Sequence, residues 1–167
     1  MSSFFDLKIT KQFLNAIEDL GFDAPSKIQE KAIPAIRSGQ HVIGIAQTGT
    51  GKTAAYLLPV LQQLKYAQGI QARCLILVPT KELVIQLMEQ TNQLSKYTDL
   101  RATALYGGVG RKAQTKAIHE GTDLIIATPR RLLELYEFEN IKLNKIQTFI
   151  LDEADRMMDM GLSLIHI

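Results

Sequence analysis

Short apolar runs alternate along the chain with longer amphipathic segments, and this alternation constrains the fold more than any other feature. Runs rich in β-branched or large apolar residues stand at 41–46, 74–78, 102–106, 124–127 and 149–151. Their continuous hydrophobicity predicts strands that are covered on both faces, as in a parallel sheet.

Amphipathic segments between the runs predict crossover helices. Residues 52–66 and 81–94 have a period near 3.6, and each follows an apolar run directly. Repeated strand, helix and parallel strand give an α/β domain with helices on both faces of a mainly parallel sheet. In such sheets, ligands bind at the carboxyl ends of the strands.

Two further helices are predicted near the start of the chain. Residues 10–20 place Phe13, Leu14 and Ile17 on one side, and Gly21 follows as a residue that commonly ends helices. Pro34 is expected to break or kink the helix predicted over 30–37, because its ring removes a backbone donor.

Composition excludes a disordered chain. The 167 residues are 46% hydrophobic with a formal net charge of +2, which is enough apolar surface for one domain with a core. The weak positive charge does not by itself indicate a nucleic-acid partner. The single cysteine, Cys74, lies in an apolar run and is interpreted as a small buried hydrophobe.

Targeting signals are not evident in the sequence. No apolar run approaches the ~20 residues that cross a bilayer, and the first residues lack a basic stretch followed by an apolar one. We therefore expect a cytoplasmic, monomeric domain with no membrane partner.

A glycine-rich segment between a predicted strand and a predicted helix is suited to phosphate binding. It reads Ala46-Gln47-Thr48-Gly49-Thr50-Gly51-Lys52-Thr53. In such a loop backbone N–H groups and a helix N-terminus surround the phosphates, the lysine reaches the β and γ phosphates, and the threonine hydroxyl binds Mg²⁺. Ala46 stands where the usual pattern has glycine, which is feasible if this residue does not need a positive φ.

Two other interpretations of the loop are disfavoured. The residues Gly49-x-Gly51-x-x-Ala54 also fit a relaxed dinucleotide fingerprint, but that fingerprint expects an acidic residue about 20 positions later. There is no Asp or Glu between Lys52 and Lys81. The Lys-Thr pair directly after Gly51 argues against a purely structural turn.

Acidic residues follow the last apolar run in the segment Asp152-Glu153-Ala154-Asp155. Asp152 is suited to a Mg²⁺ shell and Glu153 to orienting a water molecule. Alternatively, the acids favour the N-terminus of a following helix through its dipole. The catalytic interpretation is preferred if the phosphate loop follows another strand of the same sheet.

These two segments, with Gly21-Phe22-Asp23-Ala24-Pro25-Ser26-Lys27-Ile28-Gln29, closely resemble the three nucleotide-binding motifs of DEAD-box RNA helicases. The resemblance runs from about Phe4 to Gly161. It implies a RecA-like P-loop NTPase domain, three-layered α/β/α, over residues 1–167, incomplete at its C-terminal end and missing its last strands. A Q-motif region lies within 1–30, and the implied ligands are ATP and Mg²⁺.

The resemblance implies a role for each polar residue of the nucleotide site. Lys52 would grip the phosphates, and Thr53 and Asp152 would hold Mg²⁺. Glu153 would position the attacking water, and Asp155 would tie the site to a motif further along the chain.

Adenine recognition is implied for the Q motif. The Gln29 amide can donate and accept hydrogen bonds at once, which suits the adenine edge. Phe4 and Phe22 match the family's aromatic positions, and their rings either stack on the base or pack in the core.

RNA contacts are implied for residues that follow the apolar runs: Pro79, Thr80, Lys81, Glu82, Gly107, Gly108, Thr128, Pro129 and Arg131. Such residues hold phosphates and 2′-hydroxyls without reading bases. Lys81 stands where arginine is usual, which keeps the charge but loses bidentate geometry. Arg130 stands where glycine is usual.

The family's activity is ATP hydrolysis coupled to RNA duplex unwinding, and it requires parts that are absent from the sequence. A Ser-Ala-Thr motif and a second RecA-like domain, which supplies arginines to the γ-phosphate, do not occur. We therefore expect near-zero unwinding by the 167 residues alone, for which a non-catalytic nucleotide- or RNA-binding module is the alternative description. Residues 162–167 leave the family pattern and are interpreted as a truncation scar or foreign sequence.

Overall fold

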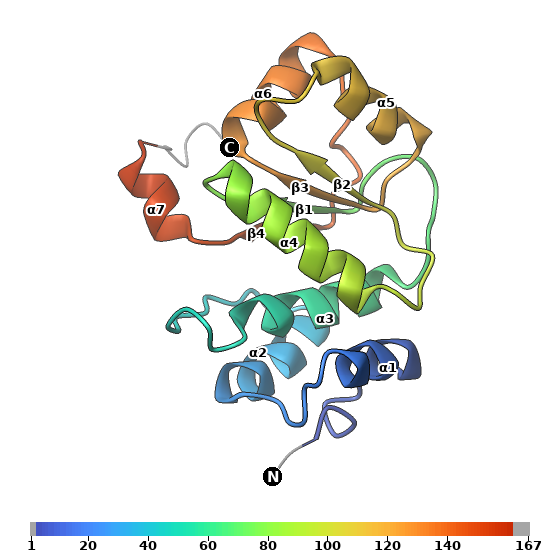
Figure 1. Ribbon diagram of the computed structural model, residues 1–167, viewed down its shortest axis with the longest axis vertical. Helices are drawn as coiled ribbons and strands as arrows, with labels where there is room; N and C mark the ends of the chain where they lie inside the picture. The colour runs from blue at the N-terminus through green and yellow to red at the C-terminus, as the bar shows by residue number, and fades with distance from the viewer. Residues whose placement is uncertain (1–2, 162–167) are drawn as a thin grey trace. The chain divides into compact units, whose positions relative to one another are not determined.

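The computed structural model describes residues 3–161, so the tail at 162–167 lies outside the described residues. Contacts divide the chain into two compact units (Figure 1). The N-terminal unit comprises Met1–Tyr66 and Gln90–Leu100, and the sheet unit comprises Ala67–Glu89 and Arg101–Ile167.

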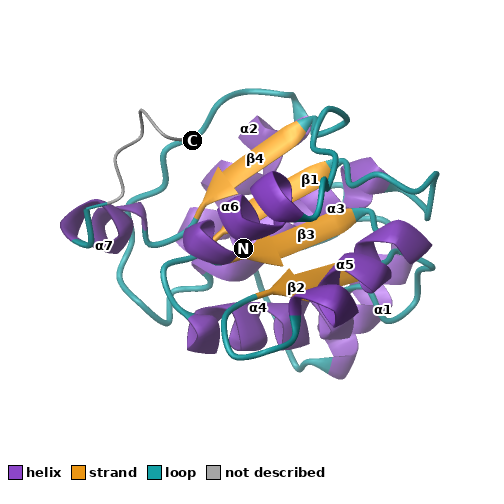
Figure 2. Cartoon of the chain, turned by 90° about the horizontal axis from the view of Figure 1, so that it is seen from above, coloured by secondary structure: helices purple, strands orange, loops and turns teal. Residues whose placement is uncertain are grey.

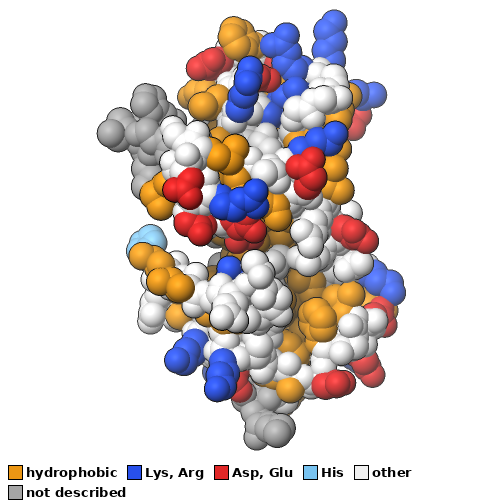
Figure 3. Space-filling model, turned by 60° about the vertical axis from the view of Figure 1, so that its left-hand side comes forward, with side chains coloured by type: hydrophobic (Ala, Val, Ile, Leu, Met, Phe, Trp, Pro, Cys, Tyr) orange, Lys and Arg blue, Asp and Glu red, His pale blue; other side chains and the backbone are white. Residues whose placement is uncertain are grey.

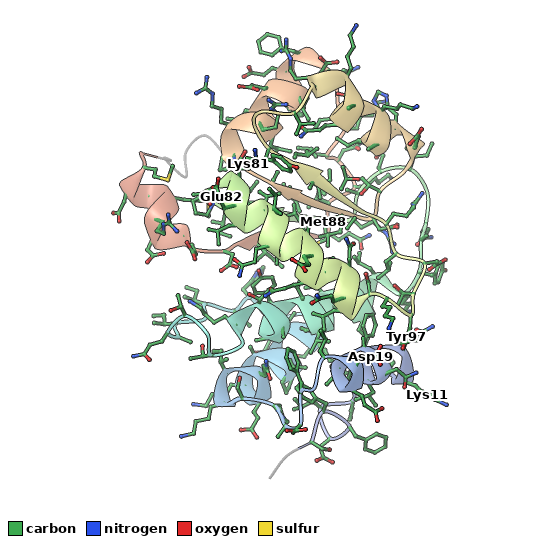
Figure 4. The ribbon with its side chains drawn as sticks, viewed as in Figure 1. Lys11, Asp19, Lys81, Glu82, Met88 and Tyr97 are labelled. Atoms are coloured by element: carbon green, nitrogen blue, oxygen red, sulfur yellow. The ribbon has the colours of Figure 1, made fainter. Side chains whose placement is uncertain are left out.

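The N-terminal unit is built from helices α1 (Lys11–Asp19), α2 (Lys27–Arg37) and α3 (Lys52–Leu64), of which α2 and α3 pack together. Helix α1 confirms the helix predicted over 10–20. On its surface Asp19 accepts hydrogen bonds from Lys96 Nζ at 2.6 Å and from the Tyr97 hydroxyl at 2.8 Å, and Figure 4 shows the Asp19 and Tyr97 side chains beside each other.

Pro34 was predicted to break or kink its helix, and a break is wrong because α2 continues through Pro34 to Arg37. A kink stays a prediction. A proline inside a helix costs about 3 kcal/mol or more. Ile33, which is fully buried, and the packing of α2 on α3 oppose that cost. The Gln63 side chain of α3 also donates a 2.9 Å hydrogen bond to the Ile36 carbonyl, which stabilises the turn that contains the proline.

The sheet unit contains strands β1 (Cys74–Leu77), β2 (Ala102–Leu105), β3 (Leu124–Ala127) and β4 (Thr148–Leu151). All pair in parallel in the order β2-β3-β1-β4, and Figure 2 shows them side by side and pointing the same way. Helices α4 (Lys81–Leu94), α5 (Arg111–Glu120), α6 (Pro129–Phe138) and α7 (Ala154–Asp159) alternate with the strands. Helix α4 begins in the sheet unit and ends in the N-terminal unit. The predicted α/β class and parallel sheet are confirmed.

The core of the sheet unit explains why the strand runs are continuously apolar. Every residue of β1 and β3 is buried, so both faces of the central strands are covered. One face packs against α5, α6 and α7 in a cluster that includes Leu75, Leu77, Leu105, Ile118, Ile125, Leu132, Leu135 and Met157. Cys74 is fully buried, as predicted, and burial raises the pKa of its thiol to about 12.

The prediction of a strand at 41–46 is wrong. These residues form no strand, and the side chains of Ile43 and Ile45 are 94% and 91% exposed. A strand requires hydrogen bonds to a neighbouring strand, and within residues 3–161 none pairs with this run. The expectation that the phosphate loop follows a strand of the same sheet as Asp152 therefore fails.

Candidate nucleotide and RNA site

The predicted phosphate loop is a tight turn that opens α3. Gly49 and Gly51 have φ of +78° and +85°, a conformation that glycine adopts without steric cost. The Thr50 hydroxyl donates a 2.7 Å hydrogen bond to the Gln47 carbonyl, which closes the turn. Lys52 is the first helical residue, so the partial positive charge of a helix N-terminus lies beside its ammonium group.

The backbone geometry of the loop depends on which residues stand at positions 51 and 46. A Cβ atom at position 51 would run into the Gln29 side-chain amide, so only glycine fits there. Ala46 is absent from the non-glycine residues with positive φ, and the condition for replacing the usual glycine is therefore met.

Gln29 joins the Q motif to the phosphate loop. Its side chain is 5% exposed, and its Oε1 accepts a 2.9 Å hydrogen bond from the Ser26 N–H. Its Nε2 donates a 3.1 Å hydrogen bond to the Gly51 carbonyl. An amide of this kind has two donor hydrogens and two acceptor lone pairs, so these two bonds leave capacity for one more bond of each kind. The adenine contact of Gln29 stays a prediction.

The two aromatic candidates lie in different environments. The Phe4 ring is buried with 5% exposed, as its core-packing interpretation expects, whereas the Phe22 ring is 42% exposed. Stacking on a base requires an accessible ring face. Of the two rings, Phe22 is therefore the one that a base could reach, and its adenine contact stays a prediction.

The sheet brings the predicted RNA residues together with the acids. Pro79 and Thr80 follow β1, Gly107 and Gly108 follow β2, Thr128 follows β3, and Asp152 follows β4. Because the strands are parallel and paired in register, these segments leave the same edge of the sheet. The predicted positions of these residues, directly after apolar strands, are thus found in the sheet unit, whereas Lys52 and Gln29 belong to the N-terminal unit.

Lys81 lies close to the glycine loop that follows β2. Its Nζ is 5.5 Å from the centre of the Tyr106 ring and 3.7 Å from where a Cβ of Gly108 would be. Figure 4 shows Lys81 and Glu82 at the beginning of α4. Tyr106 was not among the predicted site residues. Its position directly before the Gly-Gly pair was the only sequence signal.

The acidic motif has an unusual backbone at Glu153. This residue has φ of +53°, a conformation rare for non-glycine residues, which commonly marks a functional site. Its N–H donates a 3.0 Å hydrogen bond to Asp152 Oδ1, and its carboxylate forms a 2.7 Å ion pair with Arg156. Glu153 is the N-cap residue of α7, and its side chain makes no capping hydrogen bond. Figure 3 shows acidic side chains gathered on this side of the sheet unit.

Arg130 and Arg131 are neighbours with opposite exposure. The Arg130 side chain is 93% exposed, whereas that of Arg131 is 11% exposed. Arg131 donates hydrogen bonds to the Val109 carbonyl at 2.8 Å and to Gln114 Oε1 at 3.3 Å. The predicted RNA residue Arg131 therefore has its guanidinium group engaged within the sheet unit.

The described residues contain no preformed cluster of metal ligands. No group of three or more His, Cys, Asp or Glu side chains that could hold a metal ion occurs among residues 3–161. A Mg²⁺ ion that is held with nucleotide phosphates needs only one or two protein carboxylates. The Asp152 carboxylate of the sheet unit and the Thr53 hydroxyl of the N-terminal unit are each of the chemical kind that such an ion takes. In the same residues no helix is both long enough and apolar enough to span a bilayer.

A parallel α/β sheet, together with a glycine-rich loop that opens a helix at Lys52-Thr53, defines the class of P-loop nucleotide-binding proteins. Residues 26–165 match the family model described as DEAD/DEAH box helicase. The chain belongs to the DEAD/DEAH box helicase family, and its motifs are those of the N-terminal RecA-like domain.

Characterised relatives are similar over nearly the whole chain. It is 42% identical to the ATP-dependent RNA helicase SrmB of Escherichia coli over 96% of its length, and 43% identical to the DEAD-box ATP-dependent RNA helicase RhpA of Helicobacter pylori over 95%. These matches cover 37% and 32% of the relatives. The chain therefore spans about a third of the length of the curated relatives that it matches.

Solved structures show the same fold. The RNA helicase Prp28 from Chaetomium thermophilum, bound to ADP, matches with a TM-score of 0.89 and 34% identity over 96% of this chain and 40% of its own. A hypothetical ATP-dependent RNA helicase from Sulfolobus tokodaii matches with a TM-score of 0.83 and 35% identity, over 91% of this chain and 44% of its own. The RecA-like fold that the motifs imply is confirmed.

Proposed function

We propose that this chain binds ATP with Mg²⁺ and contacts the RNA backbone, as the nucleotide-binding lobe of an ATP-dependent RNA helicase. In the whole helicase, ATP hydrolysis would be coupled to separation of RNA strands, with a second RecA-like domain as the partner lobe. A cytoplasmic location stays a prediction.

The hydrogen bond from Gln29 to the Gly51 carbonyl carries this proposal. It ties a side chain suited to adenine recognition directly to the loop suited to phosphate binding. Because Gln29 is 5% exposed, its amide is held in place before any ligand arrives. A P-loop protein that does not select adenine would have no need of this link.

A few side chains carry the proposed roles in nucleotide binding and hydrolysis. Lys52 and the N–H groups of the loop bind the phosphates, and Thr53 and Asp152 are the residues proposed to hold Mg²⁺. A bound Mg²⁺ ion would neutralise charge on the phosphate oxygens. Glu153 would orient the attacking water, since its carboxylate follows the end of β4 at the ligand-binding edge of the sheet.

RNA contact is proposed along the carboxyl edge of β1, β2 and β3. The N-termini of α4 and α6 and the N–H groups of the Gly107-Gly108 loop are the kinds of group that hold phosphates. Lys81 adds an exposed positive charge at this edge. Backbone recognition of this kind is indifferent to base sequence.

Replacing Lys81 with alanine tests the RNA site. We expect weak binding of the unaltered chain to a short fluorescent oligouridylate, and a several-fold loss in the variant with a salt slope lower by about 0.7, as for one lost phosphate contact with a single strand. Fluorescence anisotropy at increasing KCl concentration measures both quantities. Lys116→Ala, an exposed lysine on α5, is the control. No binding by the unaltered chain would refute the proposed RNA function.

A further inference from the structure

The loop between β2 and α5 is held at both ends by two buried polar side chains. Gln114 Nε2 donates a 3.0 Å hydrogen bond to the Tyr106 carbonyl, just before the Gly-Gly pair. Arg131 Nη1 donates a 2.8 Å hydrogen bond to the Val109 carbonyl, just after it. Arg131 Nη1 also donates to Gln114 Oε1 at 3.3 Å, so the two side chains form one connected network.

Most of the Arg131 side chain is covered by the protein. Gln114 is 5% exposed and the Arg131 side chain is 11% exposed. The positive charge of Arg131 also has a partner, because its Nε lies 3.1 Å from Glu134 Oε2. Nη1 is thus directed at a carbonyl and an amide, and the guanidinium charge is balanced by a carboxylate, which makes Arg131 a part of the protein's own network.

The loop that this network holds requires a defined conformation. Gly108 has φ of +88°, which places the backbone where other residues are strained. The N–H groups of the Gly-Gly pair can bind a phosphate only if they are oriented toward it before binding, since ordering a loop costs about 1–2 kcal/mol per residue. Fixing the carbonyls on either side of the pair would orient those N–H groups.

We propose that Arg131 and Gln114 are positioning residues that hold the Gly107-Gly108 loop in its RNA-binding conformation, and that Arg131 makes no contact with RNA phosphates. This inference rests on the proposed RNA function and replaces the direct contact predicted for Arg131. Removing either side chain should release one end of the loop.

Salt dependence of RNA binding distinguishes positioning from direct contact. We expect Arg131→Ala and Gln114→Ala each to weaken binding of the fluorescent oligouridylate about ten-fold, as for the loss of a buried hydrogen bond to a charged group. The salt slope should stay at the value of the unaltered chain. A direct phosphate contact would instead lower the slope by about 0.7 when Arg131 is removed.

Arg131→Lys provides a second, conservative test. Arg131 uses Nη1 for Val109 and Gln114 and places Nε beside Glu134, whereas lysine keeps the positive charge on a single nitrogen. We therefore expect this variant to bind RNA as weakly as Arg131→Ala. The double variant Arg131→Ala with Gln114→Ala should be no weaker than the weaker single variant, because both act on one loop. Lys116→Ala, at the exposed lysine of α5, is the control for the loss of one charge.

The outcomes separate this inference from the function on which it rests. Failure of the unaltered chain to bind RNA overturns both. If the unaltered chain binds RNA, any one of three results overturns the positioning role alone. These results are restored affinity in Arg131→Lys, a lowered salt slope in Arg131→Ala, and unchanged affinity in Gln114→Ala. Gln114 carries no charge. A ten-fold loss of RNA affinity in Gln114→Ala, with an unchanged salt slope, therefore supports the proposal even if the Arg131 variants do not fold.

Discussion

Replacing Lys52 with alanine is expected to weaken binding of MgATP and MgADP by about 100-fold or more. The ammonium group of Lys52 is the side-chain cation of the loop and stands at the N-terminus of α3, after two glycines in the left-handed conformation. Truncating one partner of a desolvated charge pair costs about 2–5 kcal/mol, and 100-fold corresponds to about 2.7 kcal/mol. Isothermal titration calorimetry measures the two affinities.

Lys65→Ala is the matched control for this variant. Lys65 is an exposed lysine that follows the last residue of the same helix, about 20 Å from Lys52 along the axis. The control should bind nucleotide like the unaltered chain. If Lys52→Ala did so too, with an unchanged melting temperature, the loop at 47–51 would not be the phosphate site.

Replacing Asp123 with asparagine is expected to destabilise the protein by about 3 kcal/mol or more. The carboxylate is fully buried just before β3, and it accepts hydrogen bonds from Arg73 Nη2 at 2.8 Å and Arg101 Nε at 3.0 Å. The backbone N–H groups of Gln68 and Arg101 donate to it as well, at 2.9 and 3.0 Å. Removing one partner of a buried ion network leaves the other charges uncompensated, which costs about 3–5 kcal/mol.

Urea denaturation of the variant measures this loss of stability. Glu120→Gln is the control, because it removes one carboxylate from the exposed pair Lys116–Glu120, whose side chains are 77% and 66% exposed. Exposed pairs contribute little, so the control should be indistinguishable from the unaltered chain. If Asp123→Asn matched the control, the buried network would not stabilise the fold.

The same network predicts how stability depends on pH. Burial alone would raise the pKa of Asp123, but hydrogen bonds from Arg101, the Gln68 N–H and Arg73 outweigh it and lower the pKa below 3.8. Because the pKa is lower in the folded state, the stabilisation is complete above the unfolded value. It is lost as pH falls through the folded value. In this acidic range, Asp123→Asn should lose less stability than the unaltered chain.

Features that depend on local pattern could be predicted from the sequence. Helix α4 has the predicted bounds. Strands β1 and β3 occupy the predicted apolar runs, because a strand that is buried on both faces has continuously hydrophobic residues. The order of motifs along a parallel sheet also places Thr80, Gly107, Thr128 and Asp152 at one edge.

Features that depend on distant contacts could not be predicted. The run at 41–46 has strand-forming residues, but pairing depends on a neighbour that sequence pattern does not specify. Helix α2 tolerates Pro34 because of its packing on α3, which is likewise a tertiary effect. The hydrogen bonds of Gln114 and the buried position of Asp123 join residues that no motif links in the sequence.

Calorimetric titration of the chain with ATP and with GTP, each in the presence of Mg²⁺, tests the central claim most directly. The Gln29 amide beside the phosphate loop predicts one saturable site for ATP and binding of GTP that is weaker by about ten-fold or more, because a site built for one hydrogen-bonding pattern rejects the other. Equal affinity for the two nucleotides, or no binding of either, would contradict the assignment of this chain as an ATP-binding helicase lobe.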